Sequence, residues 1–237
     1  MNRKYETISI VIPVFNEEKT LVKILEMVDA VAIPLRKQII IVNDASKDGS
    51  WELLQKIAEG RPDYVIRSHE HNMGKGAALR TGIALATGDI VLIKDADLEY
   101  HPRDYPALLQ PCFEDEADVV YGSRFIGGGG PRRVLFFWHS VGNRVLTLIS
   151  NMLTNLTLSD METCYKVFRR DVIQKITIES PRFGFEPEIT QKIADQHARV
   201  FEVPIGYHGR EYAEGKKITW KDGIAAFYWM LKFKFLK

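Results

Sequence analysis

The stretch ISIVIPV at residues 8–14 decides the fold class, because it is a short run of mostly β-branched residues that ends at polar ones. Such a run is typical of a buried strand. A helical spacing of apolar residues follows from Glu17 onward, and a second strand pattern, QIIIV, occupies residues 38–42. Strand patterns that alternate with helical ones indicate βαβ units and a parallel sheet.

The same alternation continues along the chain, although it is less regular in the second half. It predicts further helices at residues 51–58, 75–86 and 186–197. It predicts further strands at residues 64–66, 89–93, 118–121, 163–168 and 199–204. We therefore predict an α/β fold with a doubly wound (Rossmann-like), mostly parallel sheet and helices on both faces. Ligands of such sheets bind at the carboxyl ends of the strands.

Composition excludes several classes of protein. The chain has 237 residues, 46% of them hydrophobic and 27% charged, which excludes global disorder. The formal net charge of +1 argues against a dedicated nucleic-acid binder. The two cysteines, Cys112 and Cys164, exclude a disulfide scaffold and a cysteine-based zinc module. A reducing, cytoplasmic compartment is the simplest interpretation.

The N-terminus lacks the apolar stretch and cleavage site of a signal peptide. No apolar run approaches the ~20 residues that cross a bilayer. The best candidate, residues 134–158, is interrupted by polar residues such as His139 and Asn143. We expect a cytoplasmic protein that is not anchored by spans of its own.

Polar residues follow three of the predicted strands. The first strand ends in PVFNEE at 13–18, the second in NDASKDGS at 43–50 and the fourth in KDADLE at 94–99. Any one of these segments is most simply explained as a turn, since Asn, Asp, Ser and Gly close loops. Because all three lie at the same edge of a parallel sheet, together they predict a binding site.

The most specific of these segments is Asp95-Ala96-Asp97. Two carboxylates separated by one residue, just past a buried strand, form a compact site of hard oxygen ligands. Mg²⁺ or Mn²⁺ suits such ligands and is usually shared with substrate phosphates. An isolated Asp-x-Asp is a weak motif, and its position at the ligand edge is what favours a metal site here.

A glycine-rich segment, NMGKGA at 72–77, opens a predicted helix. Gly74 and Lys75 could approach a phosphate or a carboxylate. The segment lacks the upstream Gly and the Ser or Thr of a P-loop, and no GxGxxG follows the first strand. An ATPase and an ordinary NAD dehydrogenase are therefore disfavoured.

Taken in order, these segments resemble the family-2 inverting glycosyltransferases with a GT-A fold, most closely the dolichyl-phosphate mannose and glucose synthase branch. The resemblance continues through YGSRF at 121–125, DMETCYK at 160–166, FGFEPE at 183–188, VPI at 203–205 and GREYAEGKKI at 209–218. It covers nearly the whole chain. It implies a single domain over 1–237, with a donor-binding half at 1–125 and an acceptor half at 126–237.

The resemblance also implies roles for individual residues. Pro13, Asn16 and Glu17 would line the nucleotide pocket, and Asp44 would contact the base. Asp95 and Asp97 would hold the metal and the diphosphate, assisted by Glu99, where the mannose-synthase branch often has Gln, and Ala96 between them would contact the substrate. The donor would be a UDP- or GDP-hexose. Asp160 and Glu186 would act as a base or would orient other groups.

The implied acceptor is polyprenyl phosphate. A phosphate monoester is already an anion, with a second pKa near ~6, so it needs positive charge rather than a general base. Basic residues that follow the predicted metal site supply this charge: Arg124, Arg132, Arg133, Arg210, Lys216 and Lys217. Of these, Arg124 and Arg210 are predicted to be catalytic. Cys164 is predicted to be a small buried residue rather than a nucleophile.

Two amphipathic segments, 132–158 and 221–237, combine aromatic with basic residues. Such segments suit the interface of a bilayer, although aromatic helices more often pack on a core. The first interpretation predicts a peripheral protein on the cytoplasmic face of a membrane, with a membrane-protein partner or self-association as a further anchor. The second predicts that the tail helix stabilises the fold.

Three other functions remain open. The same fold could serve a saccharide or protein acceptor. A sugar-nucleotide pyrophosphorylase is disfavoured because PVFNEE is not the glycine-rich basic loop expected after its first strand. A non-catalytic module that binds nucleotide sugars is disfavoured by the intact Asp95 and Asp97 pair.

Overall fold

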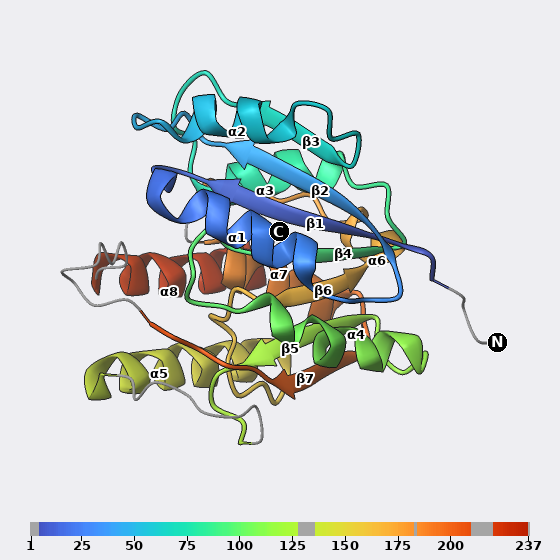
Figure 1. Ribbon diagram of the computed structural model, residues 1–237. Helices are drawn as coiled ribbons and strands as arrows, with labels where there is room; N and C mark the ends of the chain where they lie inside the picture. The colour runs from blue at the N-terminus through green and yellow to red at the C-terminus, as the bar shows by residue number, and fades with distance from the viewer. Residues whose placement is uncertain (1–4, 128–135, 183, 210–219, 237) are drawn as a thin grey trace.

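The computed structural model describes residues 5–127, 136–182, 184–209 and 220–236 (Figure 1). Its centre is a seven-stranded sheet with the strand order β3-β2-β1-β4-β6-β5-β7. The strands are β1 Thr7–Val14, β2 Arg36–Asn43, β3 Tyr64–Ser68, β4 Ile90–Ile93, β5 Val119–Ser123, β6 Lys166–Arg169 and β7 Val200–Pro204.

The predicted mostly parallel sheet is confirmed. β6 runs antiparallel to its neighbours β4 and β5, and all other neighbouring strands run parallel. The prediction placed β6 too early, at residue 163. Residues 161–165 form a turn, because the buried Lys166 ammonium donates hydrogen bonds to the carbonyl oxygens of Met161 and Thr163.

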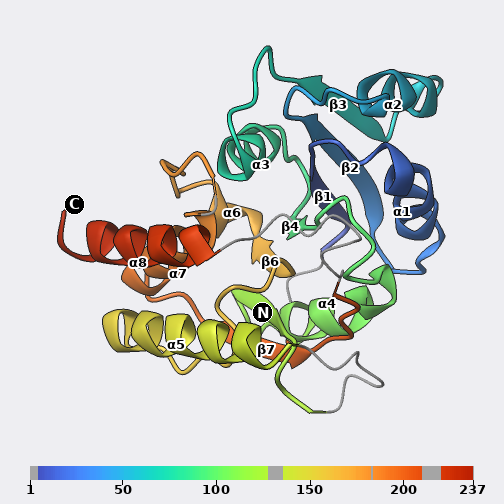
Figure 2. The ribbon, with the colours of Figure 1, turned by 90° about the vertical axis from the view of Figure 1, so that its left-hand side faces the viewer.

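Helices cover both faces of the sheet, as predicted. They are α1 Glu18–Ala30, α2 Ser50–Ala58, α3 Lys75–Ala84, α4 Tyr105–Phe113, α5 Phe137–Thr154, α6 Arg170–Ile173, α7 Phe185–Asp195 and α8 Trp220–Phe235. Figure 2 shows α1, α2 and α4 on one side of the sheet and α3, α7 and α8 on the other. β1 lies between the two layers, so Ile10 and Val11, which point to opposite faces of the sheet, are both fully buried. Burial on both faces explains why this strand reads as a continuous apolar run.

The two predicted amphipathic segments form α5 and α8, which lie side by side with α7 packed against both (Figure 2). One face of α8 belongs to the interior of the protein, since Ala226, Met230 and Phe233 are buried. The Trp229 ring stacks on Phe233 with 5.4 Å between ring centroids. The tail helix therefore stabilises the fold, whatever its other face contacts. No helix within the described ranges is long and apolar enough to cross a membrane.

We expect Met230→Ala to lower the free energy of unfolding by about 2–4 kcal/mol, because it removes a buried side chain and leaves a cavity. Met230 is only 2% exposed. The exposed neighbour Leu231 is the matched control, and its alanine variant should change stability by about 0.5 kcal/mol or less. Chemical denaturation of both variants measures the difference. Equal losses would contradict the packing of α8 on the core.

Candidate functional site

A cavity of about 480 Å³ opens where β1, β2, β4 and β5 end. Most of the predicted site residues line it: Pro13, Glu17, Asp44, Gly74, Lys75, Asp95, Ala96, Asp97, Glu99 and Arg124. Arg132, Arg133, Arg210, Lys216 and Lys217 lie outside the described residues. The strand-end carboxylates therefore meet at one edge of the sheet, as the sequence predicts.

Asn16 does not line the cavity in the described part of the chain. Its backbone has a φ of +53°, and its side-chain oxygen accepts a hydrogen bond of 2.7 Å from Lys47 N. Its own N–H donates to Ser46 Oγ. Asn16 thus joins the loop after β1 to the loop after β2, and it shapes the pocket edge from behind.

The Asp44 carboxylate organises the loop between β3 and α3. It accepts hydrogen bonds from the backbone N–H groups of Met73 and Gly74, at 2.9 and 2.6 Å, and from the Asn72 amide at 2.9 Å. His69 Nδ1 lies 2.8 Å from Asp44 Oδ1, the oxygen that also accepts from Met73 N. The observed contacts of Asp44 are with protein, and its contact with a nucleotide base stays a prediction.

Gly74 is required at its position for two reasons. Its φ is +93°, a region that residues with a Cβ rarely adopt, and a Cβ there would lie 2.4 Å from the Pro181 carbonyl oxygen. The loop before α3 therefore packs directly against the segment that precedes α7. This packing brings the second half of the chain to the cavity.

The Asp95–Asp97 turn is held from beneath by Lys94, which the sequence analysis did not identify as a functional residue. The Lys94 side chain is fully buried, and its ammonium donates to the carbonyl oxygens of Asp95 and Asp97, at 2.5 and 2.8 Å. Burial lowers the pKa of Lys94. The sequence feature that could have identified Lys94 is the position of a lysine directly after the apolar strand pattern IVLI at residues 90–93. Lys94 leaves both aspartate side chains directed away from the strand.

Lys75 joins two halves of the site. Its ammonium lies 3.0 Å from an oxygen of Asp95 and 3.0 Å from Glu186 Oε1. Burial alone would lower the pKa of Lys75, but the two carboxylates hold it well above its usual value. Burial acts to raise the pKa of Asp95, but Lys75, together with Cys164 and Lys94, lowers the pKa of that carboxyl below its usual value. Both groups are therefore ionised in the folded protein.

The acidic residues fit a divalent cation that shares its ligands with a substrate. Asp95 and Asp97 present carboxylates to the cavity, whereas Glu99 Oε2 accepts a hydrogen bond of 2.7 Å from the Tyr207 hydroxyl. Within the described ranges, no three His, Cys, Asp or Glu side chains are placed to hold a metal ion by themselves. Mg²⁺ and Mn²⁺ are commonly bound by one or two carboxylates plus phosphate oxygens, so a donor diphosphate would complete this site.

Arg124 lines the cavity but is engaged with Asp160. Its Nε and Nη2 each donate to one Asp160 oxygen at 2.7 Å, and Asn143 of α5 donates to the same carboxylate. Asp160 is fully buried and also accepts from Arg124 N. Burial works against the charge of Arg124, but Asp160 raises its pKa well above the usual value. Asp160 thus orients Arg124, and the contact of Arg124 with an acceptor stays a prediction.

The turn before β6 adds Glu162 and Cys164, which also line the cavity. Burial raises the pKa of the Cys164 thiol well above its usual value, which confirms Cys164 as a buried residue rather than an active nucleophile. Burial, and then the nearby Glu186, raise the pKa of Glu162 to about 8. Glu162 was not singled out from the sequence, because nothing in its local pattern shows that it reaches the strand ends.

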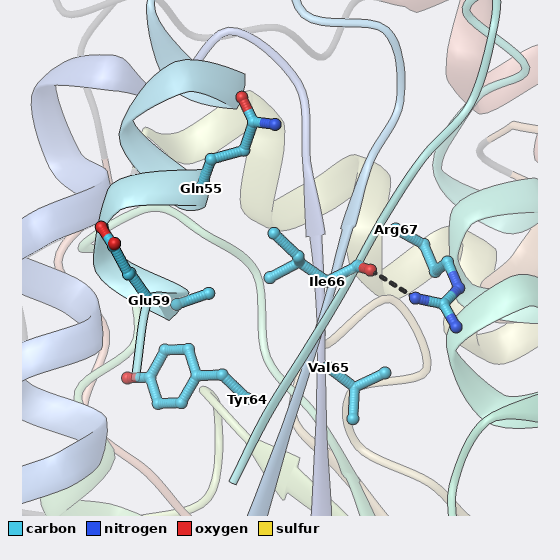
Figure 3. Close-up of a pocket in the computed structure, with 7 residues that line it drawn as sticks. Gln55, Glu59, Tyr64, Val65, Ile66 and Arg67 are labelled. Carbon is cyan, nitrogen blue, oxygen red and sulfur yellow. Dashed lines mark hydrogen bonds between the residues drawn. The ribbon is translucent and has the colours of Figure 1, made fainter. Parts of the chain in front are cut away.

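A second hollow lies on the outer edge of the sheet, between α2 and β3 (Figure 3). It is lined by Gln55, Ala58, Glu59 and residues 64–67, and Arg67 Nη1 donates to the Ile66 carbonyl at 2.9 Å. Its one carboxylate, Glu59, is exposed. This hollow lacks the convergent charged groups of the strand-end cavity, so it is not the candidate site.

Comparison with known families agrees with this geometry. Residues 9–177 match the family model of glycosyl transferase family 2. The chain therefore belongs to glycosyl transferase family 2, and the matched region contains β1 to β6 with the Asp95–Asp97 turn.

Three curated relatives are similar over 88% of this chain. A dolichol-phosphate mannosyltransferase of Pyrococcus furiosus is 26% identical, with 58% of its length covered. A dodecaprenyl-phosphate galacturonate synthase of Rhizobium johnstonii is 27% identical, with 61% covered. An undecaprenyl-phosphate 4-deoxy-4-formamido-L-arabinose transferase of Klebsiella pneumoniae is 26% identical, with 62% covered. The chain thus spans about three fifths of the length of these relatives.

Solved structures share the fold. A glucosyl-3-phosphoglycerate synthase from Mycobacterium tuberculosis is 21% identical with a TM-score of 0.74, over 97% of this chain and 81% of that one. Its complex with Mn²⁺, UDP-glucose and phosphoglyceric acid gives a TM-score of 0.71 at 20% identity, over 96% of this chain and 79% of that one. At this identity the likeness establishes the fold, which is of the GT-A type.

We expect Glu162→Gln to stabilise the protein increasingly as the pH rises. The pKa of Glu162 is higher in the folded state than in the unfolded chain. Its contribution to stability is therefore complete below the unfolded value and is lost as the pH rises through about 8. Glutamine lacks this titration, so the difference in melting temperature between variant and wild type should grow from about pH 5 to about pH 9. A constant difference would contradict the buried, proton-holding state of Glu162.

Proposed function

We propose that this chain transfers a hexose from a UDP- or GDP-sugar to polyprenyl phosphate, with inversion and with the help of Mg²⁺ or Mn²⁺. The observation that carries the proposal is the strand-end cavity, which the Asp95–Asp97 turn, Arg124 and Glu186 of α7 line together. Two of the relatives are named for transfer to a polyprenyl phosphate, and a third for transfer to dolichol phosphate.

We infer that the nucleotide-sugar donor binds beside Asp95 and Asp97, because the backbone of their turn is fixed. Lys94 holds the turn by its carbonyl oxygens, so the side chains of Asp95 and Asp97 are positioned before the donor arrives. A bound divalent cation would neutralise the charge of the leaving nucleoside diphosphate. Lys75, which is buried beside Asp95, adds a further positive charge to the same wall. The glycine-rich loop before α3 lies next to it and is held by Asp44.

The acceptor end follows from the state of Asp160. Both of its oxygens accept hydrogen bonds from Arg124, so this carboxylate orients a cation rather than removing a proton. A phosphate acceptor is already anionic and needs such a cation to bind and orient it. We infer that Arg124, with Arg210 and the other basic residues of the acceptor half, offsets the repulsion between two anionic substrates.

An outer apolar surface on α5 and α8 would place the site against a bilayer. Trp138 is 78% exposed, Met152 77% and Phe235 68%. The surface consists of Phe137, Trp138, Val145, Leu148, Met152, Phe227, Tyr228, Leu231 and Phe235. Lys232 and Lys234 lie in the last turn of α8. Aromatic side chains beside lysines suit the interface of a membrane, where the phosphate of a long-chain lipid lies. We infer a peripheral location on the cytoplasmic face, with a membrane protein or a second copy as alternative occupants.

A saccharide acceptor is the second candidate, and Glu162 is the observation that favours it. A hydroxyl nucleophile needs a general base, and burial brings the pKa of Glu162 to about 8, near the operating pH of such a base. The two candidates differ in where the product partitions.

A screen of radiolabelled donors tests the proposal. The chain is incubated with UDP- and GDP-hexoses, polyprenyl phosphate and Mn²⁺, and label is counted in the organic phase. Label from at least one donor is expected there. Label that enters only aqueous saccharide would favour the second candidate, and binding without turnover would indicate a non-catalytic module.

We expect Asp97→Ala to reduce this transfer by a factor of about 100 or more, because one electrostatic contact to the developing charge is worth about 3 kcal/mol. Asp97 lies on the surface of the cavity, so the fold should be retained. Transfer rate and melting temperature are measured together. Turnover near that of the wild type in a folded variant would refute the metal assignment.

We expect replacement of Trp138, Met152 and Phe235 by serine to weaken binding to vesicles of phosphatidylcholine and phosphatidylglycerol. Each apolar side chain buried in the bilayer is worth about 1.5–3 kcal/mol, so the combined loss should exceed a factor of about 100. These residues are exposed, so the melting temperature should not fall. Val22→Ser, at a residue 42% exposed on α1 across the sheet, is the control. Unchanged vesicle binding would leave this surface to a protein partner.

A further inference from the structure

We propose that Glu162 and Glu186 hold hydroxyl groups of the transferred sugar, and that this pair of carboxyl groups selects a neutral hexose over a uronic acid. The inference rests on the proposed function, whose donor site it completes. The relatives leave this choice open, since their names give mannose, galacturonate and a formamido-arabinose.

Two carboxyl oxygens in the cavity are buried without a partner. Glu162 and Glu186 both line it, from the turn before β6 and from the first turn of α7. Among the described residues, neither Glu162 Oε1 nor Glu186 Oε2 has a hydrogen-bond partner. Glu186 as a whole is only 5% exposed. Because buried polar atoms in proteins are nearly always paired, two such oxygens on one cavity wall indicate a ligand that brings hydrogen-bond donors.

Both side chains are mounted on fixed backbone. Lys166 donates to the carbonyl oxygens of Met161 and Thr163, on either side of Glu162, and Thr147 Oγ1 accepts from Met161 N. Glu186 lies at the start of a helix and is held through Oε1 by Lys75. A rigid mounting suits recognition, because little conformational entropy is lost when the ligand binds.

The two lysines near this pair, Lys75 and Lys166, already have partners in the protein, and this limits the charge that a ligand at the pair can carry. Lys75 forms ion pairs with Asp95 and Glu186, and Lys166 donates hydrogen bonds to backbone carbonyl oxygens. A phosphate or carboxylate at Glu162 would thus meet two carboxyl groups whose nearest lysines have other partners. Neutral hydroxyl groups, which both donate and accept, fit this wall.

The position of the pair fits the sugar rather than the nucleotide. Glu186 is linked through Lys75 to Asp95 by two contacts of 3.0 Å each. Asp95 is the carboxylate proposed to face the diphosphate, and in a donor the sugar is bonded directly to that diphosphate. Glu162 and Glu186 therefore lie next to the place proposed for the diphosphate, and the sugar bonded to that diphosphate would contact them.

Calorimetry with Mn²⁺ tests the inference without an acceptor. The ligands are UDP, GDP, and two matched pairs that differ at C6: UDP-glucose with UDP-glucuronate, and GDP-mannose with GDP-mannuronate. Glu162→Ala should weaken binding of the preferred nucleotide hexose by about tenfold and leave binding of the bare nucleoside diphosphate unchanged. The wild type should bind the hexose of that pair more tightly than the uronate.

The calorimetry is run at about pH 9, above the pKa of about 8 that burial gives Glu162. Glu162→Gln then keeps the shape of the side chain and removes its negative charge. It should narrow the preference for hexose over uronate by at least about threefold, and it serves as the main variant if the alanine variant does not fold. Glu59→Gln, the same change in the hollow of Figure 3, is the control and should alter neither preference. Melting temperatures establish that each variant is folded.

The outcomes separate the two levels of the proposal. A wild type that binds neither nucleoside diphosphates nor nucleotide sugars would refute the proposed function, and the inference with it. Normal nucleotide binding, with hexose affinity and hexose preference unaltered in both Glu162 variants, would overturn the inference alone. Equal weakening of nucleotide and nucleotide sugar would also overturn it, because the effect would not then come from the sugar.

Discussion

A partly buried ammonium between two carboxylates joins the two parts of the site. Lys75, from the first turn of α3, contacts Asp95 after β4 and Glu186 in α7, at 3.0 Å each. These elements come from widely separated parts of the sequence. The Glu186 side chain is only 6% exposed, so removing Lys75 would leave a buried carboxylate without its countercharge and would lower the stability of the protein. The three elements are thus held in one arrangement, and the cavity between them has a fixed shape.

The same ion group explains how the charges of the cavity are distributed. Burial acts to raise the pKa of Asp95, but Lys75 and the neighbouring groups lower it, which suits the role proposed for this carboxylate beside a metal ion and a diphosphate. Glu162 receives no such support, and its pKa is raised instead. One wall of the cavity therefore holds fixed charges and another holds a proton-bearing carboxyl group. Within one pocket, the first wall suits an ionic part of a substrate and the second a neutral, hydroxylated part.

The sequence predicts the first wall because its residues follow directly from strand patterns. Asp44 follows β2, and Asp95 and Asp97 follow β4, the two strands that flank β1 in parallel, and parallel strands bring their carboxyl ends to one edge. The second wall depends on β6, which enters the sheet antiparallel between β4 and β5. No local pattern encodes that insertion, so the arrival of Glu162 at the same edge was not predictable. The pairing of Arg124 with Asp160 was missed for a related reason, since the two residues are 36 positions apart and meet only in the folded sheet.

The layer formed by α5, α7 and α8 gives the site its direction toward an acceptor. Asn143 of α5 holds the carboxylate that orients Arg124, and Glu186 of α7 forms part of the cavity wall. α8 packs on α7 through Met230 and Phe233 while leaving Tyr228 and Phe235 exposed. Burial on one face and exposure on the other give this helix two separate tasks, which the sequence presented as alternatives. The surface that we propose to dock on a bilayer is thus built on the same layer of helices that supplies Asn143, which holds the carboxylate that orients Arg124.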